Sequence, residues 1–313
     1  MSNVFSIGGV CRLAHRGVIR ASGVDAASFL QGQLTNDVAG LDNGTACLAG
    51  FCSAKGRLQA SFVVWRPAAD EFVLSCPREI LAPTLKRLSM FVLRAKCKLT
   101  DASDELTMFG VAGPLAARML DGAAEWQVRA RAATTLIRLP DAADVQRAWL
   151  IVAGGSQADV PQTHDSMTSD TWRWLEVESG IVTIEAATVD RFVPQMVNFE
   201  LVGGVDFKKG CYPGQEVVAR SHYRGTTKRR TLLFDCDVLP SAGQDVYASG
   251  TASEPAGTVA NAAPHPLRAG GSALVEVRLA AAGDELHLAA ADGPLLTRRE
   301  LPYPVPLDAQ AAS

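Results

Sequence analysis

Cys211 stands in the segment of this chain best suited to chemistry, 203–220, where glycines bracket a lysine pair and the cysteine (GGVDFKKGCYPGQEVVAR). Pro213 suits the first turn of a helix because its missing N–H is not needed there, so we expect a helix from this point to about residue 224. Cys211 then precedes a helix N-terminus, whose partial positive charge, together with Lys208 and Lys209, stabilises a thiolate. Local charge and helix position therefore favour a reactive or contact role for Cys211, although an isolated cysteine is more often an inert small side chain.

The expected helix carries a polar stripe, because Glu216, Arg220 and Arg224 follow one another at intervals of four residues. On spacing alone, this stripe is a solvated ladder of ion pairs. Arg224 also begins a basic cluster with residues 228–230. That cluster is either a solvated strand start or a site for carboxylates or a partner, and the residues favour neither interpretation.

The remaining cysteines and histidines show no metal-binding pattern. The seven cysteines are an odd number, and they include no CxxC pair and no Cys/His cluster with the spacing of a metal site. A disulfide framework or a zinc centre is therefore not expected. The five histidines form no HxxxH or HExxH pair. We interpret the six cysteines other than Cys211 as core residues of a reduced protein, and we expect no metal site.

Composition and charge narrow the class of protein. The chain has 313 residues, 48% apolar and 20% charged, which is typical of a globular protein of two or three domains. Its 30 basic and 33 acidic residues give a net charge of −3, which argues against a nucleic-acid coat protein. The start lacks the pattern of a signal peptide, and no apolar run approaches the ~18 residues of a membrane helix. We therefore expect a cytoplasmic protein with no direct nucleic-acid partner and no membrane association.

The periodicity predicts an α+β body followed by an all-β module. In the body, short strands alternate with amphipathic helices, and a turn at residues 53–56 joins two strands into a hairpin. A helix over 171–179 is expected to end at Gly180. After residue 231 short β runs separated by Gly, Pro and Asn predict a small antiparallel barrel or sandwich. The tail from Leu301 is rich in Pro and Ala, so we expect poor order there.

Residues 209–216, KGCYPGQE, closely resemble the K-G-C-Y-x-G-Q-E signature of the YgfZ-type folate-binding proteins. These are relatives of the glycine-cleavage T protein, a tetrahydrofolate-dependent aminomethyltransferase. The likeness extends over nearly the whole chain through further motifs in the same order, at 29–38, 54–57, 194–198 and 223–230. We call residues 209–216 the signature segment.

The resemblance implies a fold and a function. The fold is a T-protein-like folate-binding body of two interleaved subdomains around a central cavity (1–230), followed by a C-terminal antiparallel β-barrel (231–303) and a flexible tail (304–313). The implied cofactor is tetrahydrofolate or another reduced folate. The implied role is to support iron–sulfur cluster assembly or repair, and through it iron–sulfur enzymes such as those that modify tRNA. The expected partners are folate and iron–sulfur proteins or their assembly machinery, and we expect a monomer.

The resemblance also implies site residues. Glu178 begins a Glu-Ser-Gly run similar to the E-A-G of T proteins, whose glutamate contacts the pterin, and Trp172 stands where the family has a folate-contacting tryptophan. Arg16 takes a position where some members have an aromatic residue. Cys211 and Lys209 are expected at the mouth of the cavity as the catalytic pair. The rest of the expected folate site is Tyr212, Gln215, Glu216, Arg220 and Arg224.

One departure bears on catalysis. T proteins carry an acidic pair after the hairpin glycine, and this chain has Gln59 and Ala60 there. Without that charge, aminomethyl transfer lacks the group expected to stabilise the reacting amine, so the sequence leaves enzymatic activity undecided. An accessory protein is the first hypothesis. An aminomethyltransferase and a ligand-free scaffold of the same fold are the alternatives.

Overall fold

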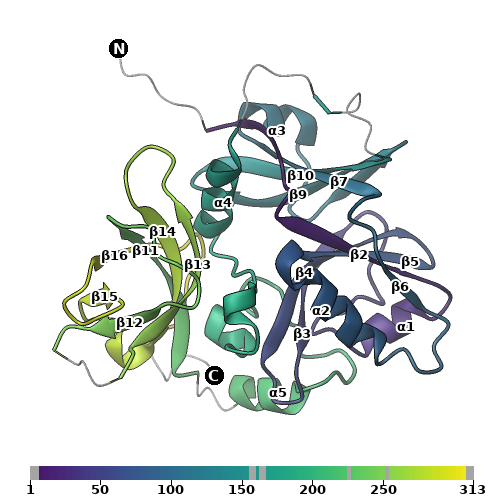
Figure 1. The fold of residues 1–313 in the computed structure, drawn as a ribbon. Coiled ribbons are helices and arrows are strands. Elements are labelled where there is room, and N and C mark those ends of the chain that lie inside the picture. Colours follow the sequence, from purple (N-terminus) through teal and green to yellow (C-terminus); the bar gives the residue numbers. More distant parts are fainter. Residues whose placement is uncertain (1–6, 155–159, 162–166, 224–226, 251–253, 308–313) are drawn as a thin grey trace.

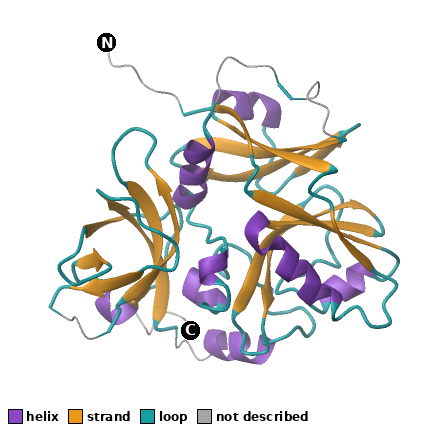
Figure 2. Cartoon of the chain, in the orientation of Figure 1, coloured by secondary structure: helices purple, strands orange, loops and turns teal. Residues whose placement is uncertain are grey.

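The computed structural model describes residues 7–154, 160, 161, 167–223, 227–250 and 254–307. Three bodies surround a centre: two antiparallel five-stranded sheets and a closed six-stranded barrel (Figure 1). The strands dominate each body, and the few helices lie against their faces or between the bodies (Figure 2). The α+β fold with a C-terminal barrel is therefore confirmed.

The first sheet has the order β3-β4-β5-β2-β6. Helices α1 and α2 cover one face of it, where Leu30, Phe62 and Ile80 share a buried cluster. Alternate strand residues point the other way, toward the centre of the molecule. The bounds are β2 (Arg16–Ser22), α1 (Ala26–Gln31), β3 (Ala46–Cys52), β4 (Leu58–Ala68), β5 (Glu71–Pro77), α2 (Arg78–Ser89) and β6 (Lys98–Asp101).

The second sheet has the order β1-β7-β10-β9-β8. Helix α3 packs on its outer face, and α4 lies between this sheet and the barrel (Figure 1). Because β1 joins this sheet before β2 to β6 build the other one, the two subdomains are interleaved in sequence, as expected. The bounds are β1 (Gly9–Arg12), β7 (Leu106–Ala112), α3 (Pro114–Leu120), β8 (Val128–Arg131), β9 (Thr134–Ala142), β10 (Val145–Ala153) and α4 (Ser169–Glu178).

The barrel closes in the order β11-β14-β13-β12-β15-β16. The composition predicted poor order from Leu301 onward, but the chain stays packed on the body there. Leu301 packs on the central core, and Tyr303 donates a hydrogen bond of 2.6 Å to the carbonyl of Gly180. Leu307 packs on the barrel core, and residues 308–313 lie outside the described part. The bounds are β11 (Arg229–Cys236), β12 (Asp245–Ala248), β13 (Gly257–Pro264), β14 (Gly271–Arg278), η4 (Leu279–Ala281), β15 (Leu286–Leu288) and β16 (Leu295–Arg299).

Between α4 and β11 the chain fills the space between the three bodies. It forms η2 (Ala186–Thr188), η3 (Pro194–Val197) and α5 (Gln215–Tyr223). Buried polar side chains tie this connection to its neighbours: Gln195 donates to the carbonyl of Val218 on α5, and Asn198 donates to the carbonyl of Thr231 on the barrel, both at 2.7 Å. The connection thereby fixes α5 and the barrel relative to one another.

Candidate functional site

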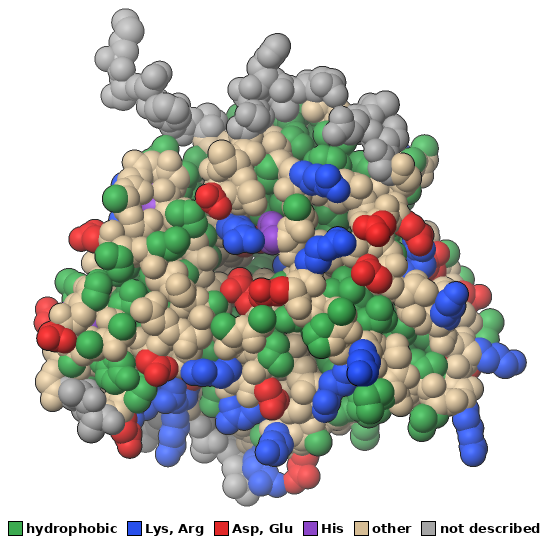
Figure 3. All heavy atoms as spheres, in the orientation of Figure 1, with side chains coloured by type: hydrophobic (Ala, Val, Ile, Leu, Met, Phe, Trp, Pro, Cys, Tyr) green, Lys and Arg blue, Asp and Glu red, His purple; other side chains and the backbone are tan. Residues whose placement is uncertain are grey.

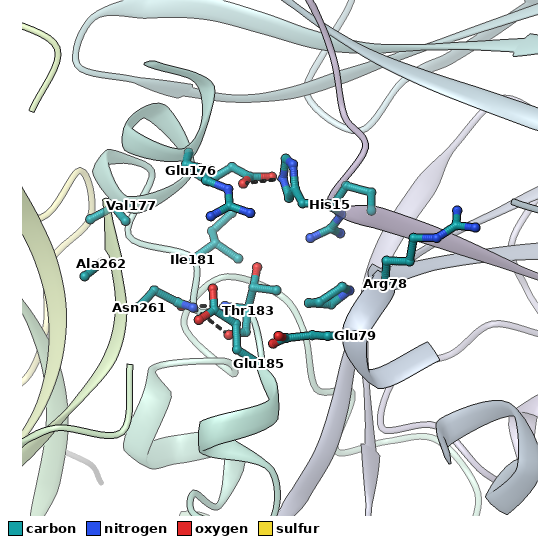
Figure 4. Close-up of a pocket in the computed structure, with 13 residues that line it drawn as sticks. His15, Arg78, Glu79, Glu176, Val177, Ile181, Thr183, Glu185, Asn261 and Ala262 are labelled. Atoms are coloured by element: carbon teal, nitrogen blue, oxygen red, sulfur yellow. Dashed lines mark hydrogen bonds and ion pairs between the residues drawn. The ribbon is translucent and has the colours of Figure 1, made fainter. Parts of the chain in front are cut away.

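A cavity of about 360 Å³ lies where β2, α2, α4 and β13 approach one another. Acidic, basic and histidine side chains meet around a hollow near the centre of the face in Figure 3, and Figure 4 shows the cavity in close-up. A recess of about 40 Å³ adjoins it and shares four lining residues with it, Arg16, Glu176, Ile181 and Thr183. We call the two together the central cavity. The cavity also touches His15, Arg78, Glu79, Arg173, Glu185 and Asn261, and the recess touches Ser61, Arg147 and Trp149.

One side of the central cavity is a cluster of paired charges. Glu176 lies 3.2 Å from Nε2 of His15, and the guanidinium of Arg16 stacks 4.8 Å from the ring centre of Trp149. Burial acts to raise the pKa of Glu176, but the His15 hydrogen bond and the charges of Arg16 and Arg147 outweigh it and lower the pKa to about 2. Glu176 is therefore a carboxylate at every physiological pH.

The opposite side carries a carboxyl group of a different kind. Asn261 of the barrel holds the backbone of Thr183 with two hydrogen bonds of 2.8 Å, which fixes the segment before Glu185 (Figure 4). Burial, helped by the negative charges of Glu79 and Glu176, outweighs a lowering hydrogen bond from Asn261 and raises the pKa of Glu185 to about 7. Glu185 can therefore hold or release a proton near neutral pH.

Two polar atoms beside these groups are buried without a hydrogen-bond partner among the described residues: Nδ1 of His15 and Nε1 of Trp149. A buried polar atom left unpaired is unfavourable, so both atoms suit a ligand with polar edges. A pterin has donor groups on one edge that carboxylates accept and a flat face that a guanidinium covers. The cavity volume also lies within the roughly 300–1,000 Å³ typical of small-molecule sites. These residues fit a folate.

Helix α4 separates the two residues that the resemblance assigned to the pterin. Trp172 and Glu178 are six positions apart, which places them about 120° apart around the helix axis. Trp172 is fully buried, and a Cβ on Gly110 of β7 would lie 2.4 Å from its ring. Glu178 points to the barrel, where it pairs with Arg299 at 2.8 Å. Neither lines the central cavity, and Glu176 instead faces it, one turn after Trp172.

The signature segment is held against the first sheet. The ammonium of Lys209 donates to the carbonyls of Gln31 and Leu34 at the end of α1, at 2.5 and 2.6 Å. Burial lowers the pKa of Lys209 to about 8, against the raising effect of Asp37 and Asp206. Lys209 therefore acts here as an anchor for the loop that carries the exposed Cys211.

Two glycines explain how the signature segment meets the β3–β4 turn. Gly214 has φ +78°, and a Cβ there would lie 2.4 Å from the carbonyl oxygen of Ser53 and 2.6 Å from the Cα of Gly56. Gly56 has φ +71°, and its Cβ would lie 2.9 Å from Val217. Both positions need glycine for conformation and for space. The turn at residues 53–56 and the signature segment are therefore in direct backbone contact.

The other residues expected at the folate site lie on or beside α5. Tyr212 is buried and Gln215 begins the helix, while Glu216 and Arg220 form an exposed ion pair on it. Arg224 lies outside the described residues. The described cavity walls include none of these residues, nor Cys211 or Lys209. Of the expected folate contacts, the structure places Arg16 alone at the central cavity.

Sequence reasoning did not single out His15, Glu176, Glu185 or Trp149. Two signals were available: His15 precedes Arg16, and Glu176 follows Trp172 by one helical turn. Gln59, which stands where T proteins have one residue of the acidic pair, brings a polar amide to this position. Gln59 lies at the bulge where Cys52 pairs with Leu58 and Phe51 with Ala60, and its side-chain oxygen is buried without a partner among the described residues.

The described residues contain no cluster of three or more His, Cys, Asp or Glu that could hold a metal ion. Within the same residues, every helix is too short or too polar to cross a membrane.

Three comparisons place the chain among known proteins. Residues 2–152 match the family model of the GCVT N-terminal domain. The structure is similar to the glycine cleavage system aminomethyltransferase T from Bartonella henselae, with a TM-score of 0.77, 95% of this chain and 86% of that chain covered, and 16% sequence identity. At that identity, the likeness shows the fold alone.

Curated relatives are more similar in sequence. The chain is 33% identical over 238 residues to the tRNA-modifying protein YgfZ of Shigella boydii serotype 4 (strain Sb227), with 72% of each chain covered. The identity and coverage are the same for the tRNA-modifying protein YgfZ of Escherichia coli O157:H7 (strain EC4115 / EHEC). With the signature segment, the interleaved sheets and the barrel in place, the chain belongs to the YgfZ family.

Proposed function

We propose that this protein binds tetrahydrofolate or another reduced folate in the central cavity and acts as an accessory protein in iron–sulfur cluster assembly or repair. Through that role it supports iron–sulfur enzymes such as those that modify tRNA. It acts in the cytoplasm as a monomer, with iron–sulfur proteins or their assembly machinery as partners and without direct contact to nucleic acid. The observation that carries the folate part is the cavity itself, whose lining combines the carboxyl groups of Glu176, Glu185 and Glu79 with the guanidinium of Arg16, stacked on Trp149.

The cavity residues divide the binding task. Glu185 and Glu79 accept hydrogen bonds from the donor edge of the pterin, and Arg16, fixed on Trp149, covers its face. Arg78 and Arg173 at the rim offer charge-assisted hydrogen bonds to the carboxylates of the glutamate tail. The folate supplies a carrier for a one-carbon unit, and the protein supplies orientation and exclusion of water.

The accessory role rests on the relatives and on Cys211. The relatives are named as tRNA-modifying proteins, and this chain keeps their type of signature segment with an exposed thiol anchored by Lys209. We expect Cys211→Ala to fold and to bind folate normally but to fail to restore iron–sulfur enzyme activity in a strain that lacks the protein. Full complementation by that variant would contradict the role of the thiol.

Titration of a reduced folate against tryptophan fluorescence tests the cavity directly. We expect quenching in the unchanged protein and a loss of affinity of about tenfold or more in Glu185→Gln, because the amide offers the pterin one acceptor instead of two. Glu178→Gln is the matched control, since Glu178 pairs with Arg299 away from the cavity. Equal loss in both variants, or none in either, would contradict the site. Absence of quenching in the unchanged protein would favour the ligand-free scaffold.

Aminomethyl transfer is the alternative function that the resemblance of the sequence motifs to T proteins raises. A turnover assay with an aminomethylated carrier protein decides it. We expect no turnover, because Gln59 and Ala60 supply no carboxylate where T proteins have the acidic pair.

A further inference from the structure

The segment that follows α2 exposes a cluster of apolar side chains. Met90, Phe91 and Leu93 leave 68%, 42% and 86% of their surface open to solvent. Val24 is 66% exposed, and the neighbouring Gly23 packs against the carbonyl of Lys96. Single exposed apolar residues are ordinary, but a contiguous group of them marks an interaction site.

The backbone of this segment is fixed although its side chains are exposed. Met90 N–H donates to the carbonyl of Arg87 and Phe91 N–H to that of Leu88, at 3.2 and 3.0 Å. At the other end, the N–H of Lys96 donates to the carboxylate of Asp25 at 2.7 Å. The ring of Phe91 meets that of Phe51 edge to face, with 6.5 Å between centroids. A preordered surface loses little entropy when it binds.

The same segment is strongly basic. No acidic residue occurs in residues 80–100, although the chain as a whole has a net charge of −3. None of the exposed cations here forms an ion pair with a described residue. They are Lys86, Arg87, Arg94, Lys96 and Lys98. We call these five cations, together with the exposed apolar residues Val24, Met90, Phe91 and Leu93, the 90–96 surface.

Helix α1 joins the 90–96 surface to the signature segment. Asp25, which precedes α1, binds Lys96, and Gln31, which ends α1, accepts from Lys209. A helix of six residues is about 9 Å long. A typical interface buries about 800 Å² on each partner, so a protein seated on the 90–96 surface also covers the neighbourhood of the signature segment.

We propose that the 90–96 surface docks a protein partner that presents an apolar side chain surrounded by acidic residues. This inference rests on the proposed function in one respect: the partner is the client protein on which Cys211 acts. The free cations select an acidic partner, and Met90 and Leu93 pack against its apolar side chain. Phosphate backbones make no use of such apolar side chains, so the combination of cations and apolar side chains favours a protein over a nucleic acid.

The experiment uses the full chain with a photo-crosslinking amino acid in place of Leu93, expressed in a strain that lacks the protein. We expect one crosslinked protein that is acidic at its contact surface. The crosslink is lost in the double variant Arg94→Glu/Lys96→Glu and weakens in about 0.5 M salt. Leu93→Glu reduces complementation by about tenfold or more, while Leu267→Glu, which changes another exposed leucine (59%, against 86% for Leu93) between β13 and β14, does not.

Folding and folate affinity are measured on the same variants, so that failure of the folate site and failure of the docking surface are separate results. Thermal unfolding and folate titration are expected to match those of the unchanged protein in Leu93→Glu. Complementation by Leu93→Glu at the full level would overturn the proposal. So would Leu93-dependent sedimentation with phosphatidylglycerol vesicles, a crosslink only to a second copy of this chain, or a crosslink to tRNA.

Discussion

The central cavity and the signature segment differ in how they use their charged and reactive groups. In the cavity, the partly buried Glu176 pairs with His15, and the buried Arg16 stacks on Trp149, so both charges are held in place. In the signature segment, Cys211 is exposed, and the backbone contact of Gly214 with Gly56 fixes the position of the segment. The proposed ligand site and the exposed thiol therefore lie on different surfaces of this protein.

The β3–β4 hairpin connects the two regions. Ser61 lines the recess of the central cavity, and Gly56 at the turn holds the signature segment. Five strand residues span at most about 17 Å, so one hairpin reaches both sites. The comparison can be tested by damaging each region while the other is measured.

Gly214→Ala is expected to have the largest effect. Its methyl group meets backbone atoms of Ser53 and Gly56, which cannot move as a flexible side chain can, and the φ of +78° is unfavourable for alanine. We expect a loss of about 3 kcal/mol in the free energy of unfolding, measured with urea. Gly210→Ala in the same segment is the control, because nothing lies within 4 Å of its Cβ. Equal stability of the two variants would contradict the packing.

Glu176→Gln tests the paired charges of the cavity. The substitution removes the negative charge that faces His15 and Arg16, and we expect a loss of about 2 kcal/mol near pH 7. Because the folded-state pKa is about 2, this contribution is present above pH 4.5 and lost as the pH falls toward 2. Glu178→Gln should not destabilise in this way, since burial raises the pKa of Glu178 despite Arg299. A difference in the free energy of unfolding between the two variants that is as large at pH 3 as at pH 7 would argue against the charge effect.

Glu185 should give the folded protein an opposite pH dependence. Its folded-state pKa of about 7 lies above the ordinary 4.5, so the folded chain holds the proton more tightly than the unfolded chain. Stability therefore falls as the pH rises from 4.5 to 7, and Glu185→Gln should gain about 1–2 kcal/mol over the unchanged protein at pH 8 but not at pH 4. Melting temperatures of both proteins across this range decide the point. If the melting temperatures of the two proteins change in parallel with pH, the predicted effect of Glu185 is contradicted.

Cys211→Ser should have the smallest effect on folding, within about 0.5 kcal/mol, because the side chain is exposed. The thiol should nevertheless react first with iodoacetamide in the native protein, as judged by mass spectrometry of the 211 peptide. Cys47 and Cys97 are partly buried, and burial raises the pKa of both, that of Cys47 to about 12. Faster labelling of either one would reverse the contrast between exposed and buried thiols.

Most elements were readable from the chain. The helix expected over 171–179 is α4 (Ser169–Glu178), and the turn expected at residues 53–56 joins β3 to β4, because clear breaks bound both. Strands β1 and β6 were missed, and so were β8 and β16. The sequences of β8 and β16, VRAR and LLTRR, are short and carry exposed arginines, and pairing with a neighbouring strand is what makes them strands.

The candidate site was readable only in part. Arg16 lines the central cavity, whereas Trp172 and Glu178 pack elsewhere. A resemblance transfers a residue type to a position, but the direction of a side chain depends on how the helix is rotated between its two neighbours. Here α4 turns Trp172 to β7 and Glu178 to the barrel, which leaves Glu176 for the cavity.

The sequence by itself determined the family, the order of the elements, the C-terminal barrel and the segment around Cys211, because each depends on local periodicity or on residues adjacent in the chain. Only the tertiary structure decided which carboxyl groups face the cavity, that Gly214 and Gly56 touch, and that Lys209 anchors α1. Those facts join residues far apart in sequence, and burial and neighbouring charge, which set the chemistry of each group, exist only once the three bodies have packed together.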